Sequence, residues 1–302
     1  MNRLFPKTKL TELAKTGKYN QGWFLSLVIT VALFVIGMLL QAGVGALIRF
    51  PIGAFTAGNQ ALYDAWTSVG EKAASGLLIV LVLVYLRVIE KRKPQTIGFR
   101  GPTPAVEYIV GFAIGLALMA VCVFANVLMG NATFDGTPQF SWILLPLLCA
   151  FLLQGMSEEV LCRGFLLHKF AARYAPIVGI LVNSMFFMVL HLLNPNVAPL
   201  PLINIVVFGV FASLYIWKRG NIWGISALHS AWNFAQGNLF GVAVSGQAPG
   251  YALFHTTFSE RGTLFSGGSF GIEGGLMCTI VFAVGIVILL FLPVRREARI
   301  EQ

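Results

Sequence analysis

The feature that most constrains this chain is a series of long apolar runs, separated by short segments that hold most of its charged residues. Several runs reach the roughly 20 residues that an α-helix needs to cross the hydrocarbon core of a bilayer. The runs lie at about 22–48, 72–89, 105–129, 142–172, 175–193, 200–217, 221–240 and 275–293. They predict an all-α, polytopic membrane helix bundle of about eight transmembrane helices. We expect a single membrane-embedded domain over 1–302, in which 142–240 supply the catalytic core.

Composition supports this prediction and excludes most soluble functions. Hydrophobic residues make up 57% of the chain and charged residues only 11%, whereas soluble domains carry about a quarter charged residues. The net charge of +9 is spread over short connecting segments, so it gives no clustered surface for nucleic acid. The four cysteines form no CxxC pair and are predicted to be small buried hydrophobic residues without a disulfide framework.

The distribution of Lys and Arg predicts how the chain is oriented. If residues 1–20 are cytoplasmic and eight helices follow, seventeen of the 21 Lys and Arg residues fall in inside segments. The outside segments hold Arg49, Lys72 and Arg261, and Arg163 lies within a helix. Loops rich in Lys and Arg lie on the cytoplasmic side of a membrane, so both termini are expected there. The run 22–48 is too long for a signal-peptide core and is expected to be retained as the first helix. We expect a multi-pass protein of a cell membrane, the prokaryotic plasma membrane given the small compact form.

The fourth apolar run contains two adjacent acids and an arginine, Glu158, Glu159 and Arg163. Ionisable residues inside a membrane are costly and usually face a bundle interior. Glu159 and Arg163 are four residues apart, so they share a helix face and can pair. Glu158 lies about 100° around the helix and remains available for chemistry. A buried ion pair that only fixes helix packing is the simpler alternative, but it leaves Glu158 unexplained.

Two further runs carry polar pairs at helical spacing. Phe187 and His191 are one turn apart in the fifth run, and His229 and Asn233 are one turn apart in the seventh. An imidazole and an amide on one face can together donate hydrogen bonds to a developing oxyanion. Each pair taken alone is also compatible with a role in packing or as an interhelical polar clasp.

A hairpin of the fourth and fifth helices is predicted to bring Glu158 and His191 together. Counting from a turn near 174–175, Glu158 and His191 are each about 24 Å deep at 1.5 Å per residue. His229 lies about ten residues past the turn at 218–219, or roughly 15 Å deep if its helix starts at the surface. Tilt or a bent helix would have to close that difference.

At these residues the chain resembles the CPBP family of intramembrane endopeptidases, which includes the CAAX prenyl proteases and the Abi-type bacteriocin-processing enzymes. The family signatures EExxxR, FxxxH and HxxxN stand here in order as Glu158-Glu159 to Arg163, Phe187 to His191, and His229 to Asn233. The resemblance covers about 140–240 and implies peptide-bond hydrolysis. It implies that Glu158 and His191 activate water, that His229 and Asn233 stabilise the oxyanion, and that Glu159 and Arg163 orient the site.

Metal use and the biological role stay open at this point. No cofactor is favoured, because the HExxH pattern of zinc proteases is missing. Zinc held by Glu158, His191 and His229 is the alternative. The expected partners are the bilayer and a peptide or membrane-anchored protein substrate, with no nucleic acid. A non-enzymatic bacteriocin-immunity or peptide-binding protein is the alternative function, and a proton-coupled transporter is a third, although no inverted repeat supports it.

Three local features carry weaker expectations. Pro146 is expected to bend the start of the fourth helix. The GxxxG pairs Gly111–Gly115 and Gly237–Gly241 are expected to allow close helix packing. The segment 241–274, rich in Gly, Ser and Phe, is interpreted either as a mobile loop or as a re-entrant piece over the bundle.

Overall fold

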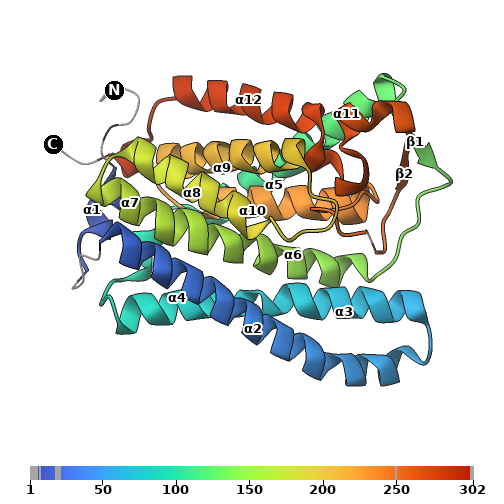
Figure 1. Ribbon diagram of the computed structural model, residues 1–302, viewed down its shortest axis with the longest axis horizontal. Helices are drawn as coiled ribbons and strands as arrows, with labels where there is room; N and C mark the ends of the chain where they lie inside the picture. Colours follow the sequence, from blue (N-terminus) through green and yellow to red (C-terminus); the bar gives the residue numbers. More distant parts are fainter. Residues whose placement is uncertain (1–5, 7, 18–21, 249, 300–302) are drawn as a thin grey trace.

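The computed structural model describes residues 6, 8–17, 22–248 and 250–299, and these form a bundle of roughly parallel and antiparallel helices (Figure 1). The longer helices are α2 (Trp23–Thr56), α3 (Gln60–Ala74), α4 (Gly76–Val88), α5 (Pro104–Leu128), α6 (Leu144–Glu159), α8 (Pro176–Leu190), α9 (Pro199–Arg219), α10 (Trp223–Phe234) and α12 (Leu276–Phe291). The short elements include α1 (Lys9–Ala14), α7 (His168–Arg173), α11 (Thr263–Ser266) and the strands β1 (Ala132–Asp135) and β2 (His255–Phe258).

Within the described residues, five helical stretches are long and apolar enough to cross a membrane. These are Trp23–Thr56, Gln60–Val88, Pro104–Leu128, Leu144–Arg173 and Pro199–Arg219, and Pro176–Leu190 and Leu276–Phe291 are shorter apolar helices. Large apolar side chains such as Leu39, Phe50 and Leu128 are exposed on the outer surface, where lipid can receive them. The all-α membrane bundle is therefore confirmed, while the number of eight crossings and the side of the termini stay predictions.

The first two predicted helices differ most from the structure in their bounds. α2 runs to Thr56 instead of ending near 48, with Pro51 inside it, and the next helix begins at Gln60 instead of 72. The polar stretch 60–71 is helical because Asn59 caps it by accepting a hydrogen bond from the Leu62 N–H. Arg49 and Lys72 therefore lie within helices and not in loops.

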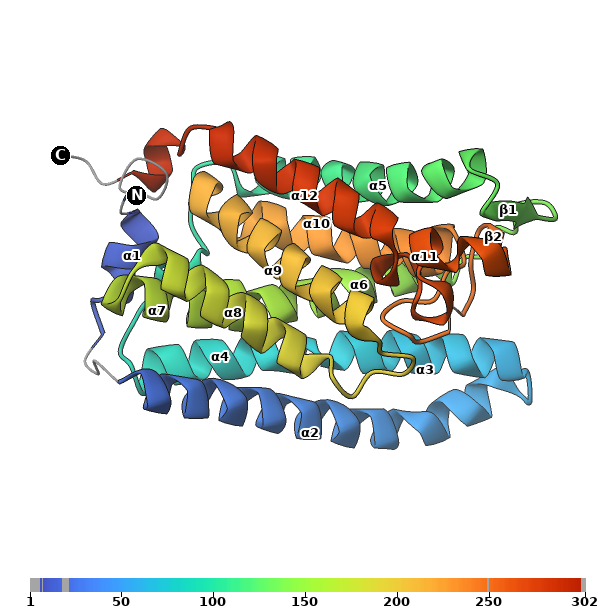
Figure 2. The same cartoon turned by 45° about the horizontal axis from the view of Figure 1, so that its top comes forward.

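The two ends of the described chain meet at one end of the bundle. Thr8 and Arg299 form an antiparallel bridge, and Figures 1 and 2 show α1 beside the segment that follows α12. This arrangement agrees with the expectation that both ends of the chain lie on one side of the membrane. Arg3, Lys7 and Lys18, which the orientation prediction counts, lie outside the described residues.

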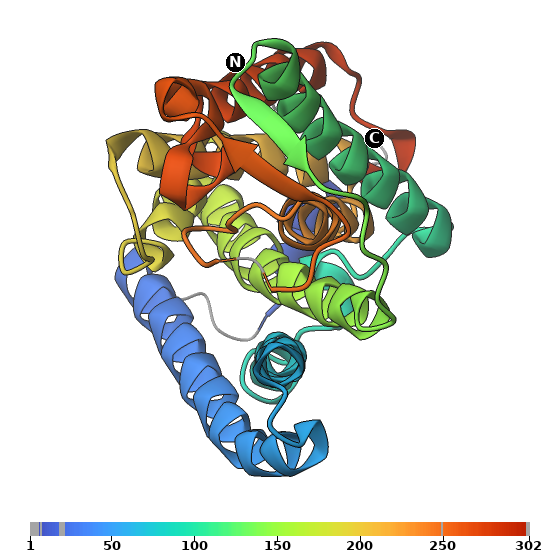
Figure 3. The ribbon, with the colours of Figure 1, turned by 90° about the vertical axis from the view of Figure 1, so that its right-hand side faces the viewer.

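The helix α10 lies at the centre of the bundle, packed against α5 and α6, and nearly all its residues are buried. By contrast, α2 packs on α3 and α4 at one side of the molecule, which Figure 3 shows along the helices. The turn before α10 is covered, because Ile222 N–H bonds to the Gly98 carbonyl and Arg295 N–H to the Lys218 carbonyl. α10 therefore begins below the surface, which removes the difference in depth expected for His229.

Close packing of α5 against α10 depends on two glycines. A Cβ on Gly111 would lie 2.0 Å from the Gly224 carbonyl oxygen, and one on Gly115 would lie 2.3 Å from that of Leu228. The prediction of close packing is confirmed for this pair. It is wrong for Gly237–Gly241, because Gly241 lies beyond the helix with φ +66°, a backbone conformation that favours glycine.

The fourth predicted helix is continuous but irregular. It comprises α6, the π-helical segment η2 (Val160–Leu167) and α7. Pro146 lies in the first turn of α6, where its missing N–H leaves no broken bond, so the expected bend has no cause there. The π segment instead begins directly after Glu159, in keeping with the frequent occurrence of π-bulges at functional sites.

The segment 241–274 is folded against the bundle. Its strand β2 pairs antiparallel with β1 (Ala132 opposite Phe258), which the sequence did not suggest. The turn at 244–247 is fixed by a Val244–Gln247 bridge and by the Gly246 N–H bonding to the Phe270 carbonyl. This part of the chain therefore forms a wall at one end of the helices and is not a free loop.

We expect Gly111→Ala to lower the unfolding temperature of the purified protein by several degrees, because the added methyl overlaps backbone of α10 and overpacking costs about 1–3 kcal/mol. Gly43→Ala is the matched control, since a Cβ there has no atom within 4 Å. Thermal unfolding of both variants in one detergent tests this. Equal unfolding temperatures would show that α5 and α10 are not held together at Gly111.

Candidate active site

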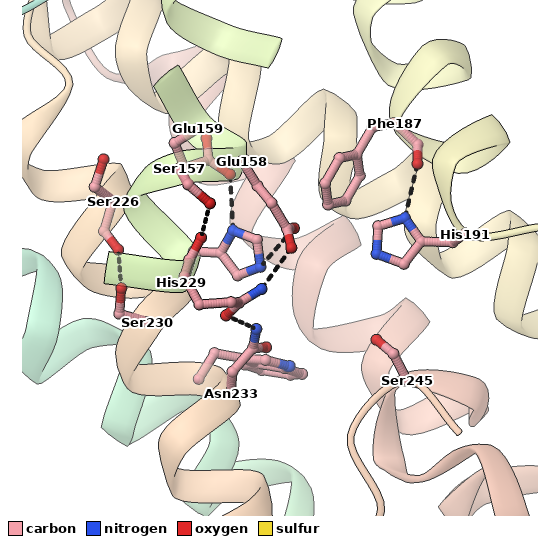
Figure 4. Close-up of polar contacts among 12 residues, drawn as sticks. Ser157, Glu158, Glu159, Phe187, His191, Ser226, His229, Ser230, Asn233 and Ser245 are labelled. Carbon is pink, nitrogen blue, oxygen red and sulfur yellow. Dashed lines mark hydrogen bonds and ion pairs between the residues drawn. The ribbon is translucent and has the colours of Figure 1, made fainter. Parts of the chain in front are cut away.

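One face of α6 forms a wall of a cavity of about 310 Å³. Leu147, Phe151, Gln154 and Glu158 line it and recur at intervals of three or four residues, the spacing of a single helix face. His191, His229 and Asn233 line the same cavity. The structure therefore brings together all four residues for which the motifs imply a role in catalysis (Figure 4).

A fully buried carboxylate connects two of the motifs. Glu159 Oε1 accepts a hydrogen bond from the Arg163 guanidinium at 2.9 Å, and the side chains of both residues are 0% exposed. The same oxygen lies 2.9 Å from Nδ1 of His229. The Glu159–Arg163 pair predicted from the sequence is confirmed, and Glu159 also fixes the ring of His229, which spacing along the chain does not reveal.

Glu158 is the acid that faces the cavity. Its Oε1 accepts a hydrogen bond from Gln154 at 2.5 Å, and its Oε2 has no hydrogen-bond partner among the described residues. The nearest charged or chargeable partner is His229, whose Nε2 is 3.7 Å from Oε2, too far for a hydrogen bond. Glu158 is therefore separate from the Glu159–Arg163 pair and has an oxygen available for a small molecule.

His191 faces Glu158 from across the cavity, at the end of α8 (Figure 4). The helix ends at Leu190, so His191 follows it instead of lying inside a run to 193 as predicted. Its Nδ1 is 2.8 Å from the carbonyl oxygen of Phe187. A carbonyl only accepts hydrogen bonds, so Nδ1 carries the proton of the neutral ring and Nε2 has a lone pair.

Phe187, the aromatic residue of the second motif, contacts a residue of the first motif as well as one of its own. The Phe187 ring lies under the Arg163 guanidinium at 4.2 Å and beside the His191 ring at 4.6 Å between centroids. A desolvated cation over an aromatic face is worth about 2 kcal/mol. Phe187 therefore fixes the imidazole relative to the buried ion pair.

The fourth residue, Asn233, bonds to a residue that the motifs do not include. Its amide donates to Gln154 Oε1 at 3.0 Å, while Gln154 donates to Glu158. Gln154 therefore bridges the candidate base and the candidate oxyanion donor. The only signal in the sequence is a glutamine four residues before Glu158 within an apolar run.

A second acid, Glu273, also lines the cavity. Its Oε2 accepts from the backbone N–H and the hydroxyl of Ser245 at 3.1 and 2.7 Å, and its Oε1 accepts from the Trp232 indole at 3.3 Å. Removal from water raises the pKa of this carboxyl, opposed by its hydrogen bonds. No motif marks Glu273, because it precedes the last apolar run as an isolated acid.

The candidate zinc ligands Glu158, His191 and His229 all line the cavity. Within the described part of the chain, no three His, Cys, Asp or Glu side chains lie together in a way that could hold a metal ion. The alternative ligand set of Glu158, His191 and His229 is not among such groups, although the bonds of Nδ1 leave Nε2 of each ring for a ligand.

Comparison with known proteins gives a match over the same helices. Residues 140–235 match the family model described as type II CAAX prenyl endopeptidase Rce1-like. This segment is similar to the CAAX protease family. The family resemblance inferred from the motifs is confirmed, and with it a peptidase in a membrane setting. No curated protein and no solved structure matches the chain.

We expect Glu159→Gln to lower the unfolding temperature far more than Glu158→Gln. The first change leaves Arg163 fully buried without its counter-charge, which typically costs about 3–5 kcal/mol. The second alters a group that faces the cavity and has no cationic partner at bonding distance. Thermal unfolding of the two variants provides the measurement, and a larger loss for Glu158→Gln would contradict the assignment of Glu159 as the structural acid.

Proposed function

We propose that this protein is an intramembrane endopeptidase in which Glu158 activates a water molecule for attack on a peptide bond. The observation that carries the proposal is the meeting of Glu158, His191, His229 and Asn233 from three helices in one cavity. Glu158 has no cation at bonding distance, so it is free to accept a proton. The CAAX protease family of residues 140–235 supports peptide hydrolysis as the reaction.

Glu158 and His191 would share the water. The Nε2 lone pair of His191 accepts one hydrogen bond from the water, and Glu158 Oε2 takes the proton as the oxygen attacks the carbonyl carbon. Collapse of the tetrahedral intermediate breaks the carbon–nitrogen bond. The proton held by Glu158 then passes to the leaving amine, so that one peptide gains a carboxylate and the other an amino terminus.

His229 and Asn233 would stabilise the oxyanion. Nδ1 of His229 donates to Glu159, which turns Nε2 toward the cavity, so the ring must carry a second proton on Nε2 to donate to the oxyanion. The Asn233 amide donates one of its two N–H hydrogens to Gln154, so the second is left to donate to a substrate carbonyl. Gln154 thereby serves as a positioning residue that keeps Glu158 and Asn233 in place.

The substrate class follows from the setting. We propose that a peptide or a membrane-anchored protein segment enters the bundle, and that the enzyme works as a multi-pass protein of a prokaryotic plasma membrane with both termini in the cytoplasm. No metal takes part in this proposal.

Glu158→Gln and His191→Ala are expected to abolish cleavage while the protein still inserts and folds, because both side chains face the cavity and neither belongs to the buried ion pair. Asn233→Ala should slow the reaction about 10²- to 10³-fold, the usual loss for one oxyanion donor. Comparison of native membranes that contain wild type or Glu158→Gln reveals the substrates that accumulate uncut.

Purified protein then gives the decisive measurement, with Arg49→Met as a control for general loss of a charge in the bundle. Arg49 pairs with Glu71 on the outer surface and does not line the cavity, so this variant should cleave normally. Full activity of purified Glu158→Gln would reject the proposed mechanism.

A further inference from the structure

The cavity contains a second acid, Glu273, that the proposed chemistry does not use. Glu273 lies shortly before α12, outside the matched segment 140–235. The residue is half-buried and lines the cavity together with Glu158. A carboxylate held away from bulk water is costly unless its charge is compensated, so Glu273 requires an explanation.

The contacts of Glu273 fix its carboxylate but do not neutralise it. Oε2 accepts hydrogen bonds from the backbone N–H and the hydroxyl of Ser245, and Oε1 accepts one from the indole of Trp232. None of these three donors carries a formal charge. Among the residues that the structure describes, no Lys, Arg or His nitrogen lies within ion-pair distance of Glu273. The carboxylate is therefore fixed in a position where a cation from a ligand can reach it.

A purely structural role does not account for the charge. Ser245 has a left-handed backbone conformation, φ +49°, in the 244–247 turn, and its two bonds to Glu273 hold that turn against the cavity. A neutral amide oxygen in place of the carboxylate could accept both bonds from Ser245 without the cost of a desolvated charge. The carboxylate is therefore better explained by a ligand that needs its charge.

The surroundings of Glu273 suit an organic cation. Trp232, which bonds to the carboxylate, and Phe282 both line the cavity, and the centres of their rings are 4.7 Å apart. Aromatic faces attract ammonium and guanidinium groups. Burial raises the pKa of the Glu273 carboxyl, and a cation beside it stabilises the charged form. A lysine or arginine side chain meets these conditions, because its stem is apolar and its end is charged.

Glu273 also lies close to the groups that are proposed to react. Its donor Ser245 is on the same side of the site as His191 in Figure 4. Its other donor, Trp232, directly precedes Asn233 in α10, and the charge of Glu273 interacts with both imidazoles of the site. An extended peptide covers only about 3.3–3.6 Å per residue. A substrate residue at Glu273 is therefore expected roughly one to three residues from the bond that is cut.

We propose that Glu273 binds a basic side chain of the substrate and so favours peptides with lysine or arginine close to the bond that is cut. The inference rests on the proposed peptidase function and adds a specificity-determining residue outside the matched segment. The ring of Trp232 supplies the aromatic wall of this subsite. An ion pair with the substrate accounts for the charge on Glu273, which no described residue of the chain neutralises.

The test uses peptides with both ends blocked, in which one position at a time near the cut carries lysine or its uncharged analogue norleucine. The full-length protein cleaves them, and mass spectrometry follows the products. At one position wild type should cleave the lysine peptide about tenfold or more faster, the usual effect of a hydrogen bond to a charged group. Glu273→Gln should lose this preference and still cleave the norleucine peptide. Equal rates at every position in wild type would refute the subsite.

Two further variants separate the charge of Glu273 from its part in the fold. Ser245→Ala removes one hydrogen bond to the carboxylate but leaves the charge, so the preference for lysine should persist. Glu71→Gln removes an acid that pairs with Arg49 and does not line the cavity, so it should cleave as wild type does. An equal loss of both peptides' cleavage in Glu273→Gln would give Glu273 a structural role only and overturn the inference.

A cross-linking measurement covers the case in which Glu273→Gln does not fold. Glu158→Gln should bind the peptides without cutting them, and a carbodiimide joins a carboxylate to an amine in contact with it. The lysine peptide should cross-link to Glu273 in this variant, whereas the norleucine peptide should form no cross-link. A cross-link to a different carboxylate would refute the inference. Cleavage that survives Glu158→Gln would instead refute the peptidase mechanism, so the two failures are distinct.

Discussion

The rest of the site depends on the buried carboxylate of Glu159. One of its oxygens bonds to both Arg163 and His229, and Arg163 in turn lies over Phe187, which packs on His191. A buried charge is tolerated only when it is paired and hydrogen-bonded. Residues of all three motifs therefore pack around this carboxylate. It fixes the orientation of the His229 ring and, through Arg163 and Phe187, the position of His191 relative to Glu158.

Two adjacent acids have different roles because a helix turns by about 100° per residue. Glu159 points into the packed interior, where Arg163 neutralises it, and Glu158 points into the cavity with an oxygen that has no partner among the described residues. The π-helical segment that follows Glu159 contains Arg163, which pairs with Glu159 and packs on Phe187. The local helix geometry thus separates a structural acid from one that faces the cavity.

The sequence predicted the helices and the motif residues because both leave local patterns, namely apolar runs and spacings of four. It did not predict that α3 begins at Gln60, because that stretch is polar and only Asn59 marks its start. It also missed Gln154, Glu273 and the pairing of β1 with β2, since each depends on a partner distant in the chain. The depth of His229 was misjudged because the turn before α10 is covered by other segments.

The candidate catalytic groups and the remaining walls of the cavity come from different parts of the chain. The acid, both imidazoles and the amide lie within the matched segment 140–235, while α2, α3 and the segment after α10 line much of the remaining surface. The helices that carry the three motifs therefore tolerate little change, because altering either Glu159 or Arg163 leaves the other with a buried charge that has no partner. The walls outside that segment carry a half-buried acid of their own, because Ser245 donates two hydrogen bonds to Glu273 at the cavity, so the groups around the site can differ while the helices of the three motifs stay the same.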